Sequence, residues 1–435
     1  MYRETSKLLL FSNLGSDSIL FKLADIFYDW KNDADNSDSL RKRIFAQIKR
    51  LLDLSTDFGF DENLWHNYLT YILITNENSF TLTCEMVGPG DGSVNVFAKN
   101  DCRIFKNLFD FDFSEIERDL GINCFSVICD YKAIPKKERM YNVNVSRKVR
   151  ALSRKIENTK DENEVFDLIT DHYRNYGIGL FGLNKAFRIK TDGGRLEFCP
   201  INNTDSITFD DLIGYEYQKK ELMDNTEAFL KGRAANNVLL YGDAGTGKSS
   251  SIKALINKYY DSGLRLIEIY KHQFEYLSAI IATVKNRNYK FIIYIDDLSF
   301  EENEVEYKFL KAVIEGGLES RPDNMLIYAT SNRRHLIKET WKDRDDMEFN
   351  GEIHRSDTIE EKLSLAGRFG ISINYSTPTR NEYLEMVKEM AKKQGVTGFS
   401  DEELCAMANR WEMRHAGICG RTAQQFVNYL AGQAH

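Results

Sequence analysis

Residues 236–257 read Asn-Asn-Val-Leu-Leu-Tyr-Gly-Asp-Ala-Gly-Thr-Gly-Lys-Ser-Ser-Ser-Ile-Lys-Ala-Leu-Ile-Asn. An apolar, β-type run from Val238 to Tyr241 enters a loop with three glycines, and Lys248 and Ser249 then open a helical pattern. Glycines let consecutive backbone N–H groups turn towards a di- or triphosphate, and the positive end of the following helix attracts the same group. The stretch therefore predicts a strand, a phosphate-binding loop and a helix.

The side chains of this loop predict the chemistry of its ligand. Lys248 is expected to reach the β- and γ-phosphates of a nucleoside triphosphate, and the Ser249 hydroxyl is expected to ligate Mg²⁺. We therefore predict a site for ATP and Mg²⁺; the alternative is a glycine-rich turn that binds nothing. The predicted nucleotide-binding residues of the loop are Gly242, Asp243, Ala244, Gly245, Thr246, Gly247, Lys248, Ser249 and Ser250.

Composition limits the remaining function classes. A chain of 435 residues, 42% of them hydrophobic, has material for two or three folded domains. The formal net charge of −8 argues against binding nucleic acid through bulk positive charge, although a local basic groove stays an alternative. The seven cysteines are an odd number without metal-type pairs, no stretch approaches 18 apolar residues, and no signal peptide is recognised. We expect a cytoplasmic protein without a membrane span.

Residues 1–200 predict an accessory domain of mixed α/β type, mostly helical with short strands. Apolar residues recur at helical spacing in three segments, 19–30, 40–52 and 64–74. Two further segments, 80–87 and 125–131, have the apolar character of strands. A hairpin is expected over 188–200.

The segment Gly177 to Gly182 formally matches the dinucleotide fingerprint GxGxxG. That motif needs a strand before it and a helix after it, whereas here a helix predicted over 162–176 precedes it. We interpret it as the turn that ends this helix.

Residues 201–377 alternate strands and helices, which is typical of a parallel sheet with crossover helices. The expected strands are 238–241, 264–269, 291–295, 325–329 and 371–375. A surface loop is expected over 333–355, followed by a helix over 358–366. Residues 378–435 contain no strand pattern and predict a helical lid, with capping boxes at Thr379 and Ser400.

Polar side chains follow the predicted central strands. Asp296 ends the buried run 291–295, where a P-loop enzyme holds Mg²⁺, and Asp297 beside it is our candidate for activating the attacking water. Asn332 ends the next strand and is expected to hold this water or the γ-phosphate. Arg368 and Arg421 are candidates for stabilising the charge of the transition state, because a guanidinium stays ionised and binds phosphate bidentately. The structural alternatives are capping, turn and surface residues.

The order of these motifs resembles the AAA+ ATPase superfamily over residues 201–435. In that resemblance, residues 242–249 match the Walker A motif, 291–297 match Walker B, and Asn332 matches sensor 1. Arg368 matches the arginine finger given by a neighbouring subunit, and Arg421 matches the sensor 2 arginine. Ile213 and Gly214 look like the segment that lines the adenine pocket.

Several runs are also similar to a bacterial family of predicted AAA+ ATPases catalogued as a domain of unknown function. These runs lie at 296–300, 316–324, 328–336 and 420–423, and the similarity extends upstream to 177–187 and 210–214. The predicted fold is thus a three-layer αβα P-loop domain with a C-terminal helical lid and an N-terminal accessory domain.

One departure from the common AAA+ pattern affects the expected activity. Walker B usually ends in Asp-Glu, whereas this chain has Asp296-Asp297, so water activation is expected to be slow or to need Glu301. No aromatic pore loop flanked by glycines is recognised, so peptide threading is not predicted. The resemblance implies a homo-oligomeric ATPase, a ring or open helix with a hexamer favoured, that remodels or loads a protein client held by residues 1–200. The alternatives are a nucleotide-dependent assembly switch and a DNA-associated ATPase of the initiator or helicase-loader type.

Overall fold

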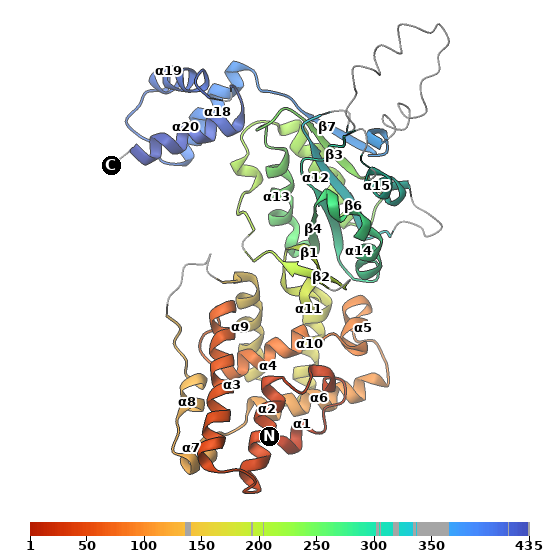
Figure 1. Ribbon diagram of the computed structural model, residues 1–435, viewed down its shortest axis with the longest axis vertical. Helices are drawn as coiled ribbons and strands as arrows, with labels where there is room; N and C mark the ends of the chain where they lie inside the picture. The colour runs from red at the N-terminus through yellow and green to blue at the C-terminus, as the bar shows by residue number, and fades with distance from the viewer. Residues whose placement is uncertain are drawn as a thin grey trace. The chain divides into compact units, whose positions relative to one another are not determined.

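A computed structural model of the protein describes residues 1–134, 141–192, 195–202, 204–301, 304, 306–315, 322–333, 336, 365–415 and 417–433. The chain divides into two compact units, which are described separately (Figure 1). The first comprises Met1–Asn184 with Pro200–Asn203, and the second Lys185–Cys199 with Thr204–His435. The division falls near Asn184 rather than near residue 200, because strand β1 (Ala186–Asp192) pairs with strand β4 (Leu264–Ile269) of the second unit.

Up to Asn184, the regular structure in the described residues of the first unit is helical, apart from one isolated bridge between Glu62 and Tyr131. Its helices are α1 (Tyr2–Thr5), α2 (Ile19–Lys31), α3 (Ser37–Phe58), α4 (Leu64–Thr75), α5 (Ser79–Val87), α6 (Val94–Phe109), α7 (Ser114–Leu120), α8 (Cys124–Cys129), α9 (Val143–Glu157), α10 (Glu162–Tyr176) and α11 (Gly179–Leu183). They enclose one core rich in aromatic and aliphatic side chains.

The prediction of two strands in this unit is wrong, because both segments form helices. Helix α5 replaces the strand expected over 80–87, and it begins with a capping box between Asn78 and Thr81. Helix α8 replaces the strand expected over 125–131, and the Glu117 carboxylate accepts hydrogen bonds from the backbone N–H groups of Phe125 and Ser126 at its start. Short apolar runs of this kind do not distinguish a strand from a buried helix, so the sequence pattern alone could not give the secondary structure of these segments.

The interpretation of the GxGxxG segment is confirmed. Helix α10 ends at Tyr176, and Gly177 has a φ of 72°, a conformation that favours glycine. Its N–H donates to the Tyr173 carbonyl, which closes the last turn of the helix. The segment therefore ends a helix and does not follow a strand.

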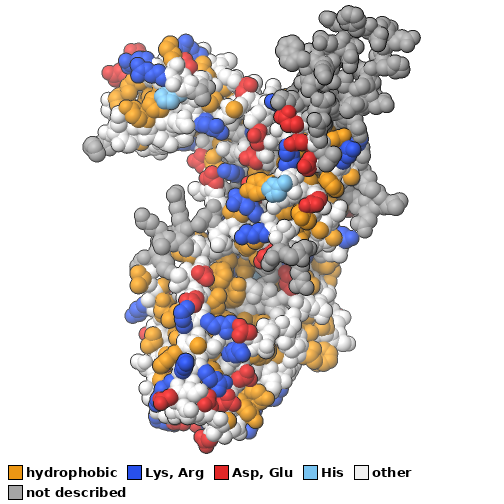
Figure 2. All heavy atoms as spheres, in the orientation of Figure 1, with side chains coloured by type: hydrophobic (Ala, Val, Ile, Leu, Met, Phe, Trp, Pro, Cys, Tyr) orange, Lys and Arg blue, Asp and Glu red, His pale blue; other side chains and the backbone are white. Residues whose placement is uncertain are grey.

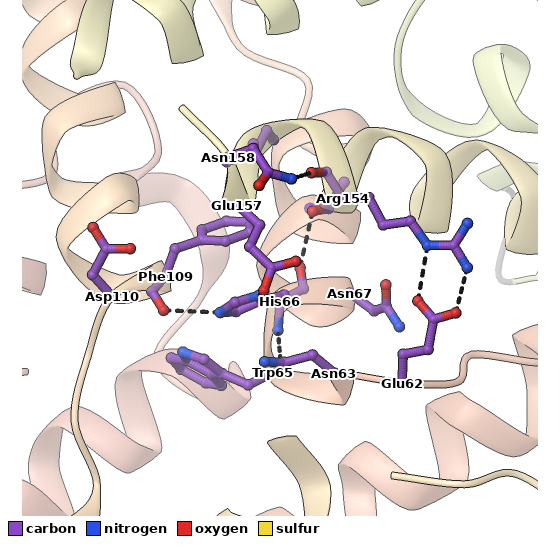
Figure 3. A network of polar contacts seen from close by, with 12 residues as sticks. Glu62, Asn63, Trp65, His66, Asn67, Phe109, Asp110, Arg154, Glu157 and Asn158 are labelled. Carbon is purple, nitrogen blue, oxygen red and sulfur yellow. Dashed lines mark hydrogen bonds and ion pairs between the residues drawn. The ribbon is translucent and has the colours of Figure 1, made fainter. Parts of the chain in front are cut away.

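Two histidines of the first unit, His66 and His172, are buried. The Nε2 atom of His66 donates to the Phe109 carbonyl oxygen at 2.8 Å, and Nδ1 lies 3.8 Å from a carboxylate oxygen of Glu157 (Figure 3). Burial lowers the pKa of His66, and burial with the nearby Lys148 lowers the pKa of His172 to about 3. Below pH 6.5, the ordinary pKa of histidine, these side chains are protonated in the unfolded chain. In the folded unit they stay neutral to a lower pH, so the unfolded chain binds more protons.

The stability of the first unit is therefore expected to fall as the pH drops below 6.5. A His172→Gln variant has no titratable group at this position. When the pH is lowered from about 7.5 to about 5.5, its free energy of unfolding should therefore fall by about 1 kcal/mol less than that of the wild type. Urea unfolding of the full chain at both pH values measures this difference. His272→Gln, at an exposed histidine of the second unit, is the control. Equal pH dependence in all three proteins would contradict the prediction.

The second unit is built on a seven-stranded sheet with the order β2-β1-β4-β5-β6-β3-β7. Its further strands are β2 (Arg195–Pro200), β3 (Val238–Gly242), β5 (Lys290–Ile295), β6 (Met325–Ser331) and β7 (Ile371–Tyr375). Along the sheet, the strands β1, β4, β5, β6, β3 and β7 each pair in parallel with the next. The residues of β5 from Phe291 to Ile295 are all buried, as their continuous apolar run predicts for a central parallel strand, and so are all residues of β6.

Helices cover both faces of this sheet, as Figure 1 shows for α13 and α14. The helices of this layer structure are α12 (Glu216–Leu230), α13 (Lys248–Tyr259), α14 (Leu277–Val284) and α15 (Glu306–Glu315). The predicted three-layer α/β fold is thus confirmed. The loop expected over 333–355 and the helix expected over 358–366 lie almost entirely outside the described residues.

Three C-terminal helices form the predicted lid: α18 (Arg380–Lys393), α19 (Asp401–Glu412) and α20 (Gly420–Gln433). They enclose a small core of their own, which includes Tyr383, Leu404 and Phe426. Both predicted capping boxes are present, at Thr379 with Glu382 and at Ser400 with Glu403. Within the described residues, no helix has the length and apolar character needed to cross a membrane.

Candidate nucleotide-binding site

The phosphate loop connects β3 to α13. Three of its glycines have positive φ values, 132° at Gly242, 77° at Gly245 and 94° at Gly247, which other residues adopt only with strain. A Cβ atom at Gly242 would lie 2.2 Å from the Tyr375 carbonyl oxygen, so a side chain there would displace the neighbouring strand β7. The loop therefore needs glycine both for its conformation and for its close packing.

Lys248 opens helix α13 and is buried. Its Nζ atom donates to the carbonyl oxygens of Gly242 at 2.9 Å and Asp243 at 2.6 Å. Burial lowers the pKa of Lys248, although the carboxylates of Asp243, Asp297 and Asp296 act in the opposite direction. A desolvated ammonium held inside the loop is positioned to meet a negatively charged phosphate.

The oxygens suited to Mg²⁺ meet at the end of β5. Ser249 Oγ donates to Asp296 Oδ1 at 2.7 Å, and Thr330 Oγ1 donates to the same oxygen at 2.6 Å. Burial favours the neutral form of Asp296, but these hydrogen bonds outweigh it and hold the pKa of the carboxyl below its usual value. Mg²⁺ takes hard oxygen ligands, and it commonly uses one or two protein groups with phosphates and waters. Ser249 and Asp296 therefore fit the predicted metal position.

Asp297 follows in a strained conformation. Its φ of 50° lies in the left-handed region, which costs a residue with a side chain about 1–3 kcal/mol. The Asn332 amide donates to Asp297 Oδ1 at 2.8 Å, and the backbone N–H of Asp297 donates to Thr330 Oγ1 at 2.9 Å. The predicted water-activating carboxylate and the predicted sensor amide are thus in direct contact.

A cavity of about 610 Å³ joins these groups to the lid. Ligand sites commonly have volumes of about 300–1,000 Å³. The predicted site residues that line it are Ile213, Gly214, Ala244, Gly245, Thr246, Gly247, Lys248, Ser249, Ser250, Asp296, Asp297, Asn332 and Arg421. The lid reaches the phosphate loop directly, because the backbone N–H of Arg421 donates to the Gly245 carbonyl oxygen at 3.1 Å.

Three predicted site residues do not line this cavity. The Gly242 and Asp243 carbonyls hold Lys248, and the Asp243 carboxylate accepts hydrogen bonds from the backbone N–H and the hydroxyl of Thr377, both at 2.7 Å. These bonds lower the pKa of Asp243 and attach the loop to the chain that enters the lid. Arg368 lies just before β7, outside the lining of its own chain's cavity.

Several lining residues were missed by the sequence analysis. Among them are Tyr215, Thr330, Met386, Met390, Gln424 and Gln425. The two glutamines follow Arg421 by three and four positions on α20, so helical spacing was a usable signal for them. Tyr215 stacks on Tyr375 with ring centroids 5.1 Å apart, a contact that no local pattern indicates.

Fold and site together define a P-loop protein of the AAA+ class. Residues 183–434, more than half of the chain, match the family model described as "Protein of unknown function (DUF815)", and the chain belongs to this family. No curated protein matches the chain.

Solved structures of RuvB from Thermotoga maritima are similar to part of the chain. The structure named as a Holliday junction branch migration motor has 18% identity and a TM-score of 0.34, covering 51% of this chain and 63% of that chain. A point mutant of the same RuvB has 17% identity and a TM-score of 0.35 with the same coverages. The matched region thus spans less than two thirds of these RuvB chains.

Proposed function

We propose that this protein binds ATP with Mg²⁺ and hydrolyses it as a homo-oligomer. The observation that carries the proposal is that Lys248 with Ser249, Asp296, and Arg421 come from three separate segments and line one cavity. Lys248 and Arg421 would neutralise phosphate charge, and Ser249 and Asp296 would hold Mg²⁺, which balances the charge that develops on the phosphate oxygens. Asp297, oriented by Asn332, would accept a proton from the attacking water.

The position of Arg368 supports a shared active site. It lies outside its own chain's cavity, so a role in phosphate chemistry requires that a neighbouring subunit receive it. Heterologous contacts of this kind produce rings or open helices, and we favour a hexamer of either form. The lid would transmit the nucleotide state to a protein client held by residues 1–200, and the protein would act as a remodeller or loader.

A nucleotide-dependent assembly switch is the second candidate, and the geometry of Asp297 favours it. This carboxylate is one methylene shorter than the usual glutamate, and its Oδ1 is already occupied by the Asn332 amide. Slow turnover with tight binding would follow from such a base.

A DNA-associated ATPase is less favoured. On the face shown in Figure 2, acidic and basic side chains are interspersed, and the described residues form no broad basic surface there. The free thiols of all seven cysteines suit a reducing compartment such as the cytoplasm.

The test is the steady-state ATPase rate of the full chain against its own concentration. We expect the rate per subunit to rise with concentration, together with an ATP-dependent increase in mass measured by light scattering, because the active site is completed by a second subunit. A monomer that binds ATP tightly without turnover would favour the switch. A monomer that neither binds nor hydrolyses ATP would contradict the proposal, and stimulation by DNA would favour the DNA-associated alternative.

A further inference from the structure

The ends of β5 and β6 bring a buried threonine beside the two acidic residues of the site. Ile295 aligns with Ala329 in the parallel pairing of these strands, so Asp296 and Thr330 follow at the same level. Thr330 is only 2% exposed, and it lines the cavity. It is also aligned with Leu240 of β3, two residues before the phosphate loop. The sheet register therefore fixes Thr330 between the phosphate loop and the carboxylates.

The hydrogen bonds of the Thr330 hydroxyl have a defined direction. The backbone N–H of Asp297 only donates, so Oγ1 accepts from it at 2.9 Å. The hydroxyl has a single proton, which it donates to Asp296 Oδ1 at 2.6 Å. One hydroxyl thus orients the carboxylate of Asp296 and at the same time restrains the backbone of Asp297.

The restraint on Asp297 matters because its conformation is strained. A left-handed φ of 50° persists only where surrounding contacts enforce it. Thr330 supplies two of these contacts, because its carbonyl oxygen also accepts from the N–H of Leu298 at 2.7 Å. Without the hydroxyl, the turn loses the bond that holds the Asp297 N–H, and the carboxylate that faces Asn332 is free to rotate away.

We propose that Thr330 is a positioning residue, which orients Asp296 towards Mg²⁺ and holds Asp297 in its strained, water-facing conformation. The inference rests on the proposed function of the same cavity. It predicts that loss of the hydroxyl impairs the magnesium-dependent steps and spares the binding of nucleotide without metal, because Thr330 acts through the two carboxylates while Lys248 and the loop hold the phosphates.

The central test is Thr330→Val, which replaces the hydroxyl by a methyl group of similar shape. Loss of a residue that orients a metal ligand typically costs about 10- to 100-fold in metal affinity or activity. We expect the Mg²⁺ concentration for half-maximal ATPase activity to rise about tenfold or more, and kcat to fall by a similar factor. A fluorescent ATP analogue titrated in EDTA should bind with a Kd within about twofold of wild type, and the same titration with Mg²⁺ should show weaker metal-dependent tightening.

Two controls separate positioning from a general loss of stability. Thr330→Ser keeps the hydroxyl and should restore the Mg²⁺ requirement to within about threefold of wild type. Thr226→Val removes another buried hydroxyl, one that contacts Tyr328 away from the cavity, and it should not change the Mg²⁺ requirement. Thermal unfolding of each variant checks folding, and Thr330→Ala replaces the valine variant if that one does not fold.

The outcomes distinguish this inference from the function on which it rests. A normal Mg²⁺ requirement and kcat in Thr330→Val, with an active wild-type protein, would overturn the role of Thr330 alone. Equal defects in Thr330→Val and Thr330→Ser, matched by Thr226→Val, would also overturn it, because they indicate a general packing effect. A wild-type protein that binds no nucleotide would overturn the proposed function and this inference together.

Discussion

Replacing Lys248 by alanine is expected to abolish ATP binding at ordinary nucleotide concentrations. The ammonium is buried in the phosphate loop, and losing one partner of such a desolvated charge pair typically costs about 2–5 kcal/mol, or about 30- to 4,000-fold in affinity. Isothermal titration of the variant with ATP and Mg²⁺ measures the loss. The fold should survive, because the carbonyl groups that Lys248 contacts belong to Gly242 and Asp243, neither of which is buried.

The matched control is Lys258→Ala. Lys258 belongs to the same helix α13, carries the same charge and is exposed, but it does not line the cavity. Its replacement should leave the Kd for ATP within about twofold of wild type, since exposed charges contribute little. Intact affinity in Lys248→Ala would contradict the assignment of the phosphate loop. A parallel loss in both variants would indicate a bulk charge effect on binding.

The second large effect is expected for Arg368→Ala, which should leave ATP binding nearly intact and stop hydrolysis. An arginine that stabilises the transferred phosphoryl group from a neighbouring subunit is worth about 10³- to 10⁵-fold in kcat. Because Arg368 does not line the cavity of its own chain, its loss should not change the Kd of that chain for ATP. Single-turnover hydrolysis and nucleotide titration separate the two effects. Arg414→Ala, at an exposed arginine of the lid, is the control.

Mixing two inactive variants tests whether Arg368 acts between subunits. An Arg368→Ala subunit retains an intact cavity with Asp297, and an Asp297→Ala subunit retains Arg368. Where the cavity of the first subunit faces the arginine of the second, the interface contains both intact groups. With equal amounts and random assembly, about one interface in four is complete, and activity should return to that level. Failure of every mixture to regain activity, while mixed oligomers form, would remove the main support for a shared site.

Local signals in the sequence were sufficient for much of the second unit. The strand, loop and helix around Lys248, the central strand before Asp296 and both capping boxes of the lid are found where the sequence predicts them. These features depend on residues close together in the chain: glycines with positive φ, an unbroken apolar run, and a hydroxyl three residues before a glutamate. The interactions that produce these features therefore lie within a few residues of one another in the chain, where sequence patterns can detect them.

The accessory region shows where local signals were insufficient. The segments 80–87 and 125–131 are short and apolar, and a run of this kind does not distinguish a strand from a buried helix. For helix α8 the deciding partner is Glu117, whose carboxylate accepts its first N–H groups. Strands β1 and β2 likewise join the sheet of the second unit only because β1 finds an edge at β4, about 80 residues further along the chain.

The sequence by itself determined that this protein has a phosphate loop, a carboxylate at the end of its central strand and a helical lid, because each is encoded by neighbouring residues. Only the tertiary structure decided how they combine. It placed Arg421 and two glutamines of the lid beside the loop, and it set Thr330 against Asp296 and Asp297. Those contacts join segments more than 30 residues apart, and they follow from the register of parallel strands and the packing of the lid. No local pattern of residues contains that information.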